Sequence, residues 1–184
     1  RSSLSLPFTE QKTKYYREVE AAVDVVERAC RLCLDVKKSL FSSDGRILEK
    51  NDQTPVTIAD FGVQALVSLE MNRLSPSIPL VAEEDSAFLR SNNLFGSVVD
   101  VVKDKATLGD ELTEDNILQA IDRGGKDAYV FEPKPATYWI LDPIDGTRGF
   151  VKGSEALYVV GLALVVEGQI VLGVMGCPNW HEDC

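Results

Sequence analysis

A short acidic segment contains the residues whose types and spacing are best suited to chemistry. It reads Asp142-Pro143-Ile144-Asp145-Gly146-Thr147. Magnesium is a hard cation that takes carboxylate, carbonyl and water oxygens, and this segment can supply two Asp side chains and the Ile144 carbonyl between them. Pro143 stiffens the turn, and Gly146 permits a tight backbone. The segment therefore predicts a metal-binding loop.

A second acidic segment is expected to lie beside the first. Residues 78–82 form a short apolar run that predicts a buried strand, and Glu83, Glu84 and Asp85 follow it. Residues 138–141 predict another buried strand, which ends at Asp142. Open α/β arrangements place their sites where strands end, so the two segments are expected to converge. Either segment alone would more often be a solvated turn or a helix cap, and it is the combination that favours a metal site.

The residues after Asp145 are suited to binding an anion. The backbone N–H groups of Gly146 and Thr147 can hold a phosphate oxygen if a helical turn begins there, and the Thr147 hydroxyl can position a water. Two metal ions about 3.5–4 Å apart would turn a bound water into a nucleophile and neutralise the phosphate. Without them, Glu83, Asp142 and Asp145 would repel a phosphate dianion, so the chemistry is expected to need divalent cations.

The composition of the whole chain argues against several classes of function. The 184 residues are 45% hydrophobic and 26% charged, as in an ordinary globular protein. The formal net charge of −10 argues against nucleic-acid binding. No apolar run approaches the roughly 20 residues that a membrane span needs. His181 is the single histidine, which weakens histidine-based catalysis and zinc schemes.

The spacing of apolar residues predicts the helices that must position these acids. Residues 15–40 have apolar residues at three- and four-residue steps, which predicts a long amphipathic helix. Cys30 and Cys33 fall within this pattern and are expected to pack rather than to bind metal. Residues 50–55 are expected to form a polar loop before a helix over residues 60–74. By itself, Asp60 would be interpreted as an acid at the start of that helix.

The remaining elements are an insertion and a hairpin. Residues 86–138 are expected to be inserted between two strands and to contain a helix over 94–105 and another that begins after Thr113 and ends before Gly124. Residues 157–166 and 170–175 predict a hairpin that turns at Glu167 and Gly168. Residues 1–13 are interpreted as a transit-peptide remnant or a disordered arm, and 14–184 as one metal-binding domain, incomplete at its carboxy end.

Three segments together resemble the inositol monophosphatase-like superfamily, which includes the fructose bisphosphatases. They are residues 54–60, 81–86 and 139–150, and the resemblance extends over residues 14–180. It is closest to the 3'(2'),5'-bisphosphate nucleotidase branch of plant and yeast type, because of Ala82-Glu83-Glu84-Asp85-Ser86, Arg148-Gly149-Phe150 and the long insertion before Asp142. The resemblance implies a layered αβαβα fold of the α+β class, with the amino-terminal α+β domain here and the carboxy-terminal domain largely missing.

The resemblance also implies roles for individual residues. The metal ligands would be Glu83, Asp142, the Ile144 carbonyl and Asp145. Thr147 would activate water, with Asp60 as its partner or as an outer metal ligand.

The activity implied is a lithium-sensitive step of sulfur metabolism. It uses two or three Mg²⁺ ions to convert 3'-phosphoadenosine 5'-phosphate to AMP and phosphate. The expected partner is a small nucleotide or sugar phosphate, with no nucleic acid and no membrane. An organelle, either mitochondrion or chloroplast, is favoured over the cytoplasm, and the oligomeric state is left open.

One departure from the family pattern leaves alternatives open. Members complete the second metal site with an aspartate from a carboxy-terminal Trp-Asp motif, which is absent here, so the chain is expected to be a fragment or a non-catalytic product. The alternatives are an inositol phosphate phosphatase and a truncated metal-binding paralogue. A third is a haloacid-dehalogenase-type phosphatase, whose motif has one residue between its aspartates instead of Pro143 and Ile144.

Overall fold

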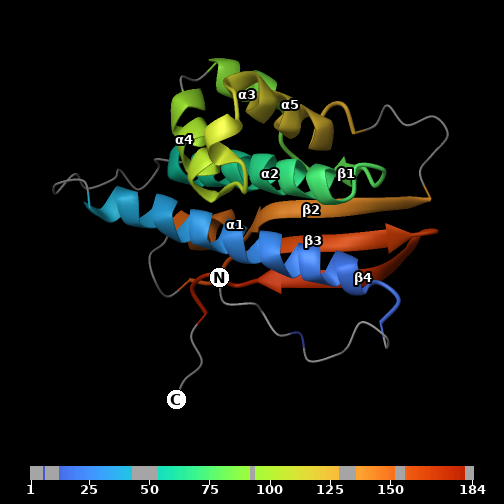
Figure 1. Cartoon of the computed structure of the whole chain (residues 1–184). Helices are drawn as coiled ribbons and strands as arrows, with labels where there is room; N and C mark the ends of the chain where they lie inside the picture. The colour runs from blue at the N-terminus through green and yellow to red at the C-terminus, as the bar shows by residue number, and fades with distance from the viewer. Residues whose placement is uncertain are drawn as a thin grey trace.

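The computed structural model of the chain describes residues 6, 13–42, 54–91, 94–128, 136–151 and 156–180. These residues form a mixed α+β fold in which helices pack against a four-stranded sheet (Figure 1). The predicted α+β class is confirmed. Most of the expected amino-terminal arm, most of the expected loop over residues 50–55, and His181 lie outside the described residues.

The first helix, α1, spans Tyr16–Ser42 and confirms the predicted amphipathic helix. Its buried residues recur at helical spacing and include Ala22, Val25, Ala29 and Cys33, all 0% exposed. This face packs against the second helix and against the last two strands of the sheet.

The second helix, α2, spans Thr54–Leu74 and begins six residues earlier than predicted. Pro55 explains the error, because proline is tolerated in the first turn of a helix, where its missing N–H is not needed. Thr54 and Pro55 therefore belong to the helix rather than to the expected loop. The interpretation of Asp60 as a residue at the helix start is wrong, since Asp60 lies in the second turn.

The sheet has the strand order β1-β2-β3-β4. Strand β1 (Leu80–Val81) is parallel to β2 (Thr137–Asp145), whereas β3 (Val159–Val166) is antiparallel to β2 and to β4 (Gln169–Gly176). β1 is shorter than predicted. β2 is longer than predicted, because residues 142–145, which were expected to follow the strand, form its last four residues. Its pairing with β3 shifts register between Asp142 and Asp145.

The predicted hairpin is confirmed, and its turn has the geometry that twisted strands favour. Glu167 and Gly168 both have positive φ angles, 50° and 79°. Two-residue turns with positive φ at both positions match the right-handed twist of the flanking strands. The last two strands therefore pair closely, from Val166 with Gln169 to Val160 with Gly176.

The described residues of the insertion between β1 and β2 form four helical segments. They are α3 (Ser86–Ser91), α4 (Phe95–Lys105), the short 3-10 helix η2 (Gly109–Glu111) and α5 (Glu114–Gly124). The predicted α4 and α5 are confirmed, the latter with a reciprocal capping box between Thr113 and Asn116. α5 runs one residue further than expected and includes Gly124. The sequence did not predict α3 and η2, which are too short to show a periodic pattern.

The helix α2 lies between two hydrophobic cores. Figure 1 shows α3, α4 and α5 on one side of α2 and the sheet on its other side. On the sheet side, Val63 and Leu66 pack with Trp139 and the buried face of α1. On the other side, Phe61 and Ala65 pack with α4 and α5. Burial on both sides fixes α2 firmly, and α2 carries Asp60.

Candidate metal and phosphate site

The carboxyl ends of β1 and β2 bring the two acidic segments together. Val81 pairs with Ile140 in parallel register, and Glu83 and Asp142 each come two residues later along the chain. The charge of Glu83 acts on Asp142. Burial raises the pKa of Asp142 most, and the charges of Asp145 and then Glu83 raise it further. The expected convergence of the two segments is present in the structure.

Asp60 joins this group from α2. Burial raises the pKa of its carboxyl group from 3.8 to about 8, with further contributions from the charges of Glu84, Glu83 and Asp142. The pKa of Glu84 is itself raised by burial and by Glu83. Three separate segments, α2, the β1–α3 loop and the end of β2, thus contribute acids to one electrostatic cluster.

The end of β2 holds Asp142 and Asp145 on its exposed side. Between them, Ile144 has its side chain in the core at 3% exposure, and its backbone N–H donates to the Asp142 carboxylate. Asp145 pairs with Val159 after the register shift. A buried side chain at Ile144 anchors the segment, so that both flanking carboxylates remain directed away from the core.

A short helix begins at the position expected for phosphate binding. Gly146 has a φ angle of 90°, which favours glycine, and helix α6 spans Thr147–Val151. The carbonyl of Gly146 accepts the N–H groups of Gly149 and Phe150, at 2.7 and 3.2 Å. Gly146 and Thr147 are both exposed, so groups at this turn are accessible to a ligand.

An aromatic contact packs α6 against the residue that precedes β3. Phe150 is 1% exposed and meets Tyr158 edge to face, with ring centroids 5.0 Å apart. The Nζ atom of Lys37 lies 5.7 Å from the Phe150 ring centroid and 5.1 Å from that of Tyr158. These contacts tie the turn after Asp145 to α1 and to the start of β3.

The carboxylate oxygens of this cluster are the type of ligand that a hard divalent cation prefers. The clustered groups are carboxylates, and their mutual repulsion would be relieved by a cation. Among the residues that the structure describes, however, no group of three or more Asp, Glu, His or Cys side chains is close enough to hold a metal ion as it stands. Glu83, Asp142 and Asp145 are exposed, so their side chains would have to move together to form a coordination shell.

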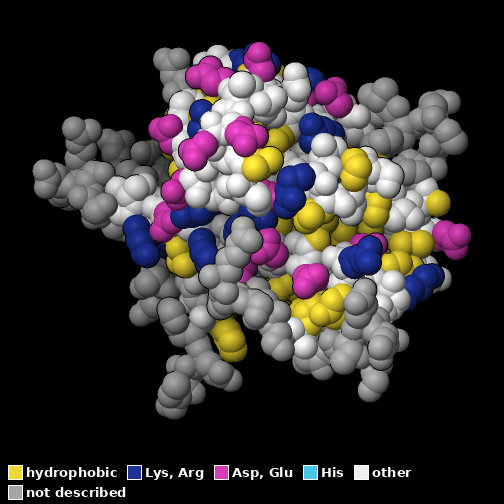
Figure 2. Space-filling model, viewed as in Figure 1, with side chains coloured by type: hydrophobic (Ala, Val, Ile, Leu, Met, Phe, Trp, Pro, Cys, Tyr) yellow, Lys and Arg dark blue, Asp and Glu magenta, His cyan; other side chains and the backbone are white. Residues whose placement is uncertain are grey.

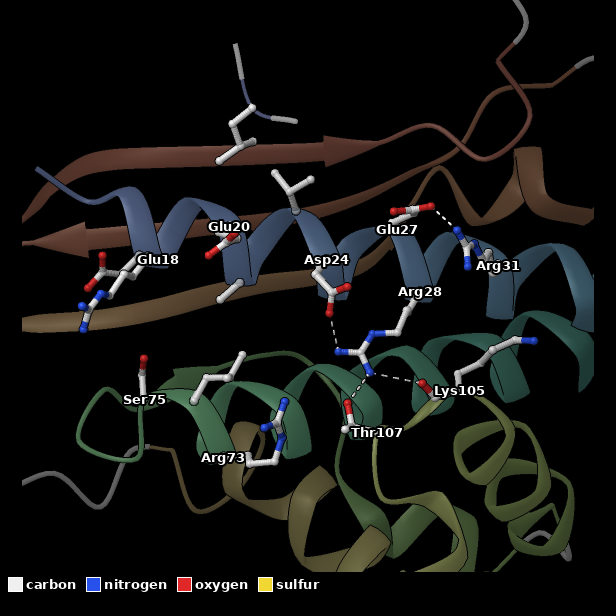
Figure 3. A pocket seen from close by; sticks show the side chains of 15 residues that line it. Glu18, Glu20, Asp24, Glu27, Arg28, Arg31, Arg73, Ser75, Lys105 and Thr107 are labelled. Atoms are coloured by element: carbon white, nitrogen blue, oxygen red, sulfur yellow. Dashed lines mark hydrogen bonds and ion pairs between the residues drawn. The ribbon is translucent and has the colours of Figure 1, made fainter. Parts of the chain in front are cut away.

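A separate cavity of about 1140 Å³ lies along α1, away from the carboxylate cluster. It reaches Arg73 at the far end of α2, roughly 20 Å along the helix from Asp60 at 1.5 Å per residue. Figure 3 shows that some of its charged side chains pair with each other, namely Arg28 with Asp24 at 2.7 Å and Arg31 with Glu27. Figure 2 likewise shows acidic and basic side chains interspersed on this face.

The described cysteines are free thiols, and Cys30 and Cys33 pack in or beside the core. Cys33 is buried, Cys30 is partly buried and Cys177 is exposed. The pKa of Cys30 is raised to about 11, mainly by burial and further by the nearby Cys177 and Glu27. A raised thiol pKa disfavours the thiolate that metal binding needs. In the described part of the chain, no helix combines the length and apolar character needed to cross a bilayer.

Comparison with known proteins agrees with this architecture. The sequence profile of the inositol monophosphatase family matches residues 15–183. The chain belongs to the inositol monophosphatase family. Enzymes of this family use divalent metal ions, generally Mg²⁺, which fits a site built from carboxylates.

Several plant members of the family are similar to this chain. An Arabidopsis thaliana protein named "Putative 3'(2'),5'-bisphosphate nucleotidase, mitochondrial" is 71% identical over 180 residues, covering 97% of this chain and 45% of the relative. "3',5'-bisphosphate nucleotidase 2" of the same species is 45% identical, covering 90% of this chain and 48% of the relative. An Oryza sativa 3'(2'),5'-bisphosphate nucleotidase is 40% identical, with 90% and 47% covered. The chain thus spans about half the length of the curated relatives it matches.

Sequence reasoning missed a buried polar residue that contacts the backbone of one of the acidic segments. Gln64 is fully buried on α2 and hydrogen-bonds the backbone of Glu84. The available signal was a glutamine placed among apolar residues, Val63, Ala65 and Leu66, in a helix that is apolar on most sides. A polar residue in such a position must find partners, but the sequence does not reveal which.

Proposed function

We propose that the chain forms the metal-binding part of a Mg²⁺-dependent phosphatase that converts 3'-phosphoadenosine 5'-phosphate to AMP and phosphate. The observation that carries the proposal is the electrostatic coupling of Asp60, Glu83 and Asp142, which come from three segments. The 71% identity to a relative named as a 3'(2'),5'-bisphosphate nucleotidase supports the substrate class.

In this proposal the acids divide into ligands and a water-activating pair. Glu83, Asp142, the Ile144 carbonyl and Asp145 hold the metal. When bound, Mg²⁺ supplies charge neutralisation and lowers the pKa of a coordinated water.

The remaining site residues act on the water and on the phosphate. Asp60 receives the proton of the attacking water through the Thr147 hydroxyl. The backbone N–H groups of Gly146 and Thr147, at the start of α6, orient the phosphate oxygens.

Phosphate release from purified protein tests the proposal. We would measure Mg²⁺-dependent release from 3'-phosphoadenosine 5'-phosphate and from inositol 1-phosphate, with and without EDTA. The assay would use the 184-residue chain and a chimera in which the remaining part of the 71% identical relative follows it. The expected result is nucleotide hydrolysis by the chimera that EDTA abolishes.

Substitutions sharpen this test. Asp145→Asn should reduce the activity of the chimera more than tenfold, because it removes a proposed ligand. Asp100→Asn, which changes an exposed acid on α4, should leave it unchanged. A loss below tenfold in Asp145→Asn would count against the proposal. A covalent phosphate on Asp142 would instead favour a haloacid-dehalogenase-type mechanism.

The assay on the 184-residue chain also tests a second candidate, which is metal binding without catalysis. In that case the 184-residue chain would bind Mg²⁺ through residues 60–147 but release no phosphate. Residues 14–184 would then act as one metal-binding domain. An inositol phosphate specificity would appear as preferential hydrolysis of inositol 1-phosphate by the chimera.

We also propose that the protein acts in an organelle, because the 71% identical relative is named as mitochondrial. Fractionation of cells followed by immunodetection would test this. Recovery of the protein with mitochondria is the expected result, and recovery with the cytosol would contradict it.

A further inference from the structure

The Gln64 side chain connects α2 to the acidic loop between β1 and α3. Gln64 is 0% exposed and lies four residues, or about 6 Å along the helix axis, after Asp60. Its Nε2 donates to the carbonyl of Glu84 at 2.7 Å, and its Oε1 accepts the N–H of Glu84 at 2.8 Å. The amide thus pairs with both backbone groups of one residue, as a neighbouring strand would.

The second N–H of Gln64 is used as well. Nε2 also donates to the carbonyl of Ile121 at 2.8 Å. This carbonyl lies in the last turn of α5 and also accepts the N–H of Gly125 at 3.0 Å. Both donors of the amide and one acceptor position are therefore engaged. Such an arrangement fixes the side chain in one orientation, because any rotation would leave buried polar groups unpaired.

The end of α5 supports the same loop from the other side. The N–H of Ser86 donates to Asp122 at 3.0 Å, and that of Ala82 donates to the carbonyl of Gly124 at 2.6 Å. A Cβ atom at Gly125 would lie 1.9 Å from the Glu84 carbonyl oxygen, so the backbones meet too closely for a side chain. The loop is consequently held on both of its flanks, by Gln64 and by α5.

We propose that Gln64 is a positioning residue for the candidate metal site, because it fixes the backbone next to Glu83 relative to Asp60 on the same helix. This inference rests on the proposed function, since it assigns a role within the same site. Glu83 and Asp60 belong to different segments, and Gln64 joins those segments directly through buried hydrogen bonds. Loss of that link would allow the loop to move and would weaken metal binding without removing any ligand.

A glutamate at this position could not replace the amide. A carboxylate can accept the N–H of Glu84, but it cannot donate to the carbonyls of Glu84 and Ile121, and it would add charge beside an acidic cluster. Gln64→Glu should therefore behave like Gln64→Met, which preserves approximate length and removes all polar groups. Outer residues that orient metal ligands typically contribute 10- to 100-fold to metal affinity.

Binding of Mn²⁺, followed by electron paramagnetic resonance of the free ion, tests the inference on the full 184-residue chain. We expect Gln64→Met and Gln64→Glu to raise the Mn²⁺ dissociation constant about tenfold or more. The matched control is Ser68→Ala, one turn further along α2. Ser68 is 1% exposed and contacts α5 through Arg123 rather than the acidic loop. Its affinity should equal that of the wild type even if its thermal stability falls.

The possible outcomes separate the two proposals. A wild-type chain that binds no Mn²⁺ would overturn both the proposed function and this inference. A folded Gln64→Met variant with wild-type affinity would overturn the inference alone.

If both Gln64 variants fail to fold, amide hydrogen exchange of the wild-type chain tests the inference instead. Saturating Mg²⁺ should slow exchange at the Glu84 amide about tenfold, because a ligand that binds the closed loop suppresses its opening. The amide of Val102, buried in α4, serves as the reference. No change at Glu84 would overturn the inference.

Discussion

Arg28 on α1 forms an ion pair with Glu70 on α2, with 3.1 Å between Nη1 and Oε1. The Glu70 side chain is 3% exposed and also accepts the backbone N–H and the hydroxyl group of Thr107, at 2.6 and 2.9 Å. Burial alone would raise the pKa of Glu70, but the bonds from Thr107 and Arg28 outweigh it and lower the pKa. One buried carboxylate thus joins α1, α2 and the segment after α4.

Removal of Arg28 should weaken this network, in which Arg73 on α2, 43% exposed and 3.1 Å from Glu70, remains as the other cation. We expect Arg28→Met to reduce the free energy of unfolding by about 2 kcal/mol, in the range for a lost hydrogen bond to a charged group. Urea denaturation at pH 7 would measure the loss. The control is Arg31→Met, because Arg31 is 58% exposed and pairs with Glu27 on the surface of the same helix. It should cost less than about 1 kcal/mol, and equal losses in the two variants would contradict the prediction.

The same carboxylate predicts a pH dependence. The folded pKa of Glu70 is lowered below its ordinary value of 4.5, so its ionised form contributes stability that is present above about pH 4.5. That contribution is lost as the pH falls through the folded pKa. Urea denaturation between pH 3 and pH 6 should therefore show a steeper acid loss for the wild type than for Glu70→Gln. Parallel pH profiles would contradict this assignment.

Asp60 should make the metal-free protein less stable as the pH rises. The pKa of Asp60 in the folded state is about 8, above the ordinary value of 3.8. Between these two pH values the folded state binds a proton that the unfolded state has released, so the folded state loses stability as the pH rises from about 4 to 8. In EDTA at pH 8.5, Asp60→Asn should melt about 3 °C above the wild type, and at pH 5 the difference should vanish.

Magnesium and a second acid serve as controls for this prediction. Mg²⁺ should raise the melting temperature of the wild type more at pH 8.5 than at pH 5.5, because it replaces the proton as the partner of the acidic cluster. Asp100→Asn alters an exposed acid on α4 and should show no pH-dependent gain. Calorimetry would measure the melting temperatures of the wild type and both variants. If Asp100→Asn raised the melting temperature at pH 8.5 as much as Asp60→Asn does, the effect could not be assigned to Asp60.

The sequence predicts the elements whose signals are local and periodic. The long helix α1, the helix α5 with Thr113 as its cap, and the hairpin turn at Glu167 and Gly168 all depend on residues a few positions apart. The start of α2 was misplaced because Pro55 suits both a loop and the first turn of a helix. Glu83, Asp142 and Asp145 became candidates because they follow two apolar runs, whereas Asp60 became one only through the family resemblance.

Contacts between distant segments were not predictable in the same way. Gln64 and Glu84 are 20 residues apart, and Glu70 and Thr107 are 37 residues apart. Nothing in their local sequence indicates these partners, because the pairing depends on how α2 lies between the sheet and the inserted helices. The sequence therefore predicted that the two acidic segments lie together, but not which residues hold them in place.

Gly149 should be unable to accept even a methyl group. A Cβ atom there would lie 2.3 Å from the carbonyl oxygen of Leu157, so α6 and the segment before β3 would have to separate. We expect Gly149→Ala to reduce the free energy of unfolding by about 2 kcal/mol, in the range of other overpacked sites. The matched control is Gly96→Ala, on the exposed side of α4, where a Cβ atom would meet nothing within 4 Å. That variant should gain about 0.5–1 kcal/mol, because alanine is favoured over glycine inside a helix. Urea denaturation of both variants would show opposite signs for the same substitution, and a neutral Gly149→Ala would contradict the close approach of α6 to Leu157.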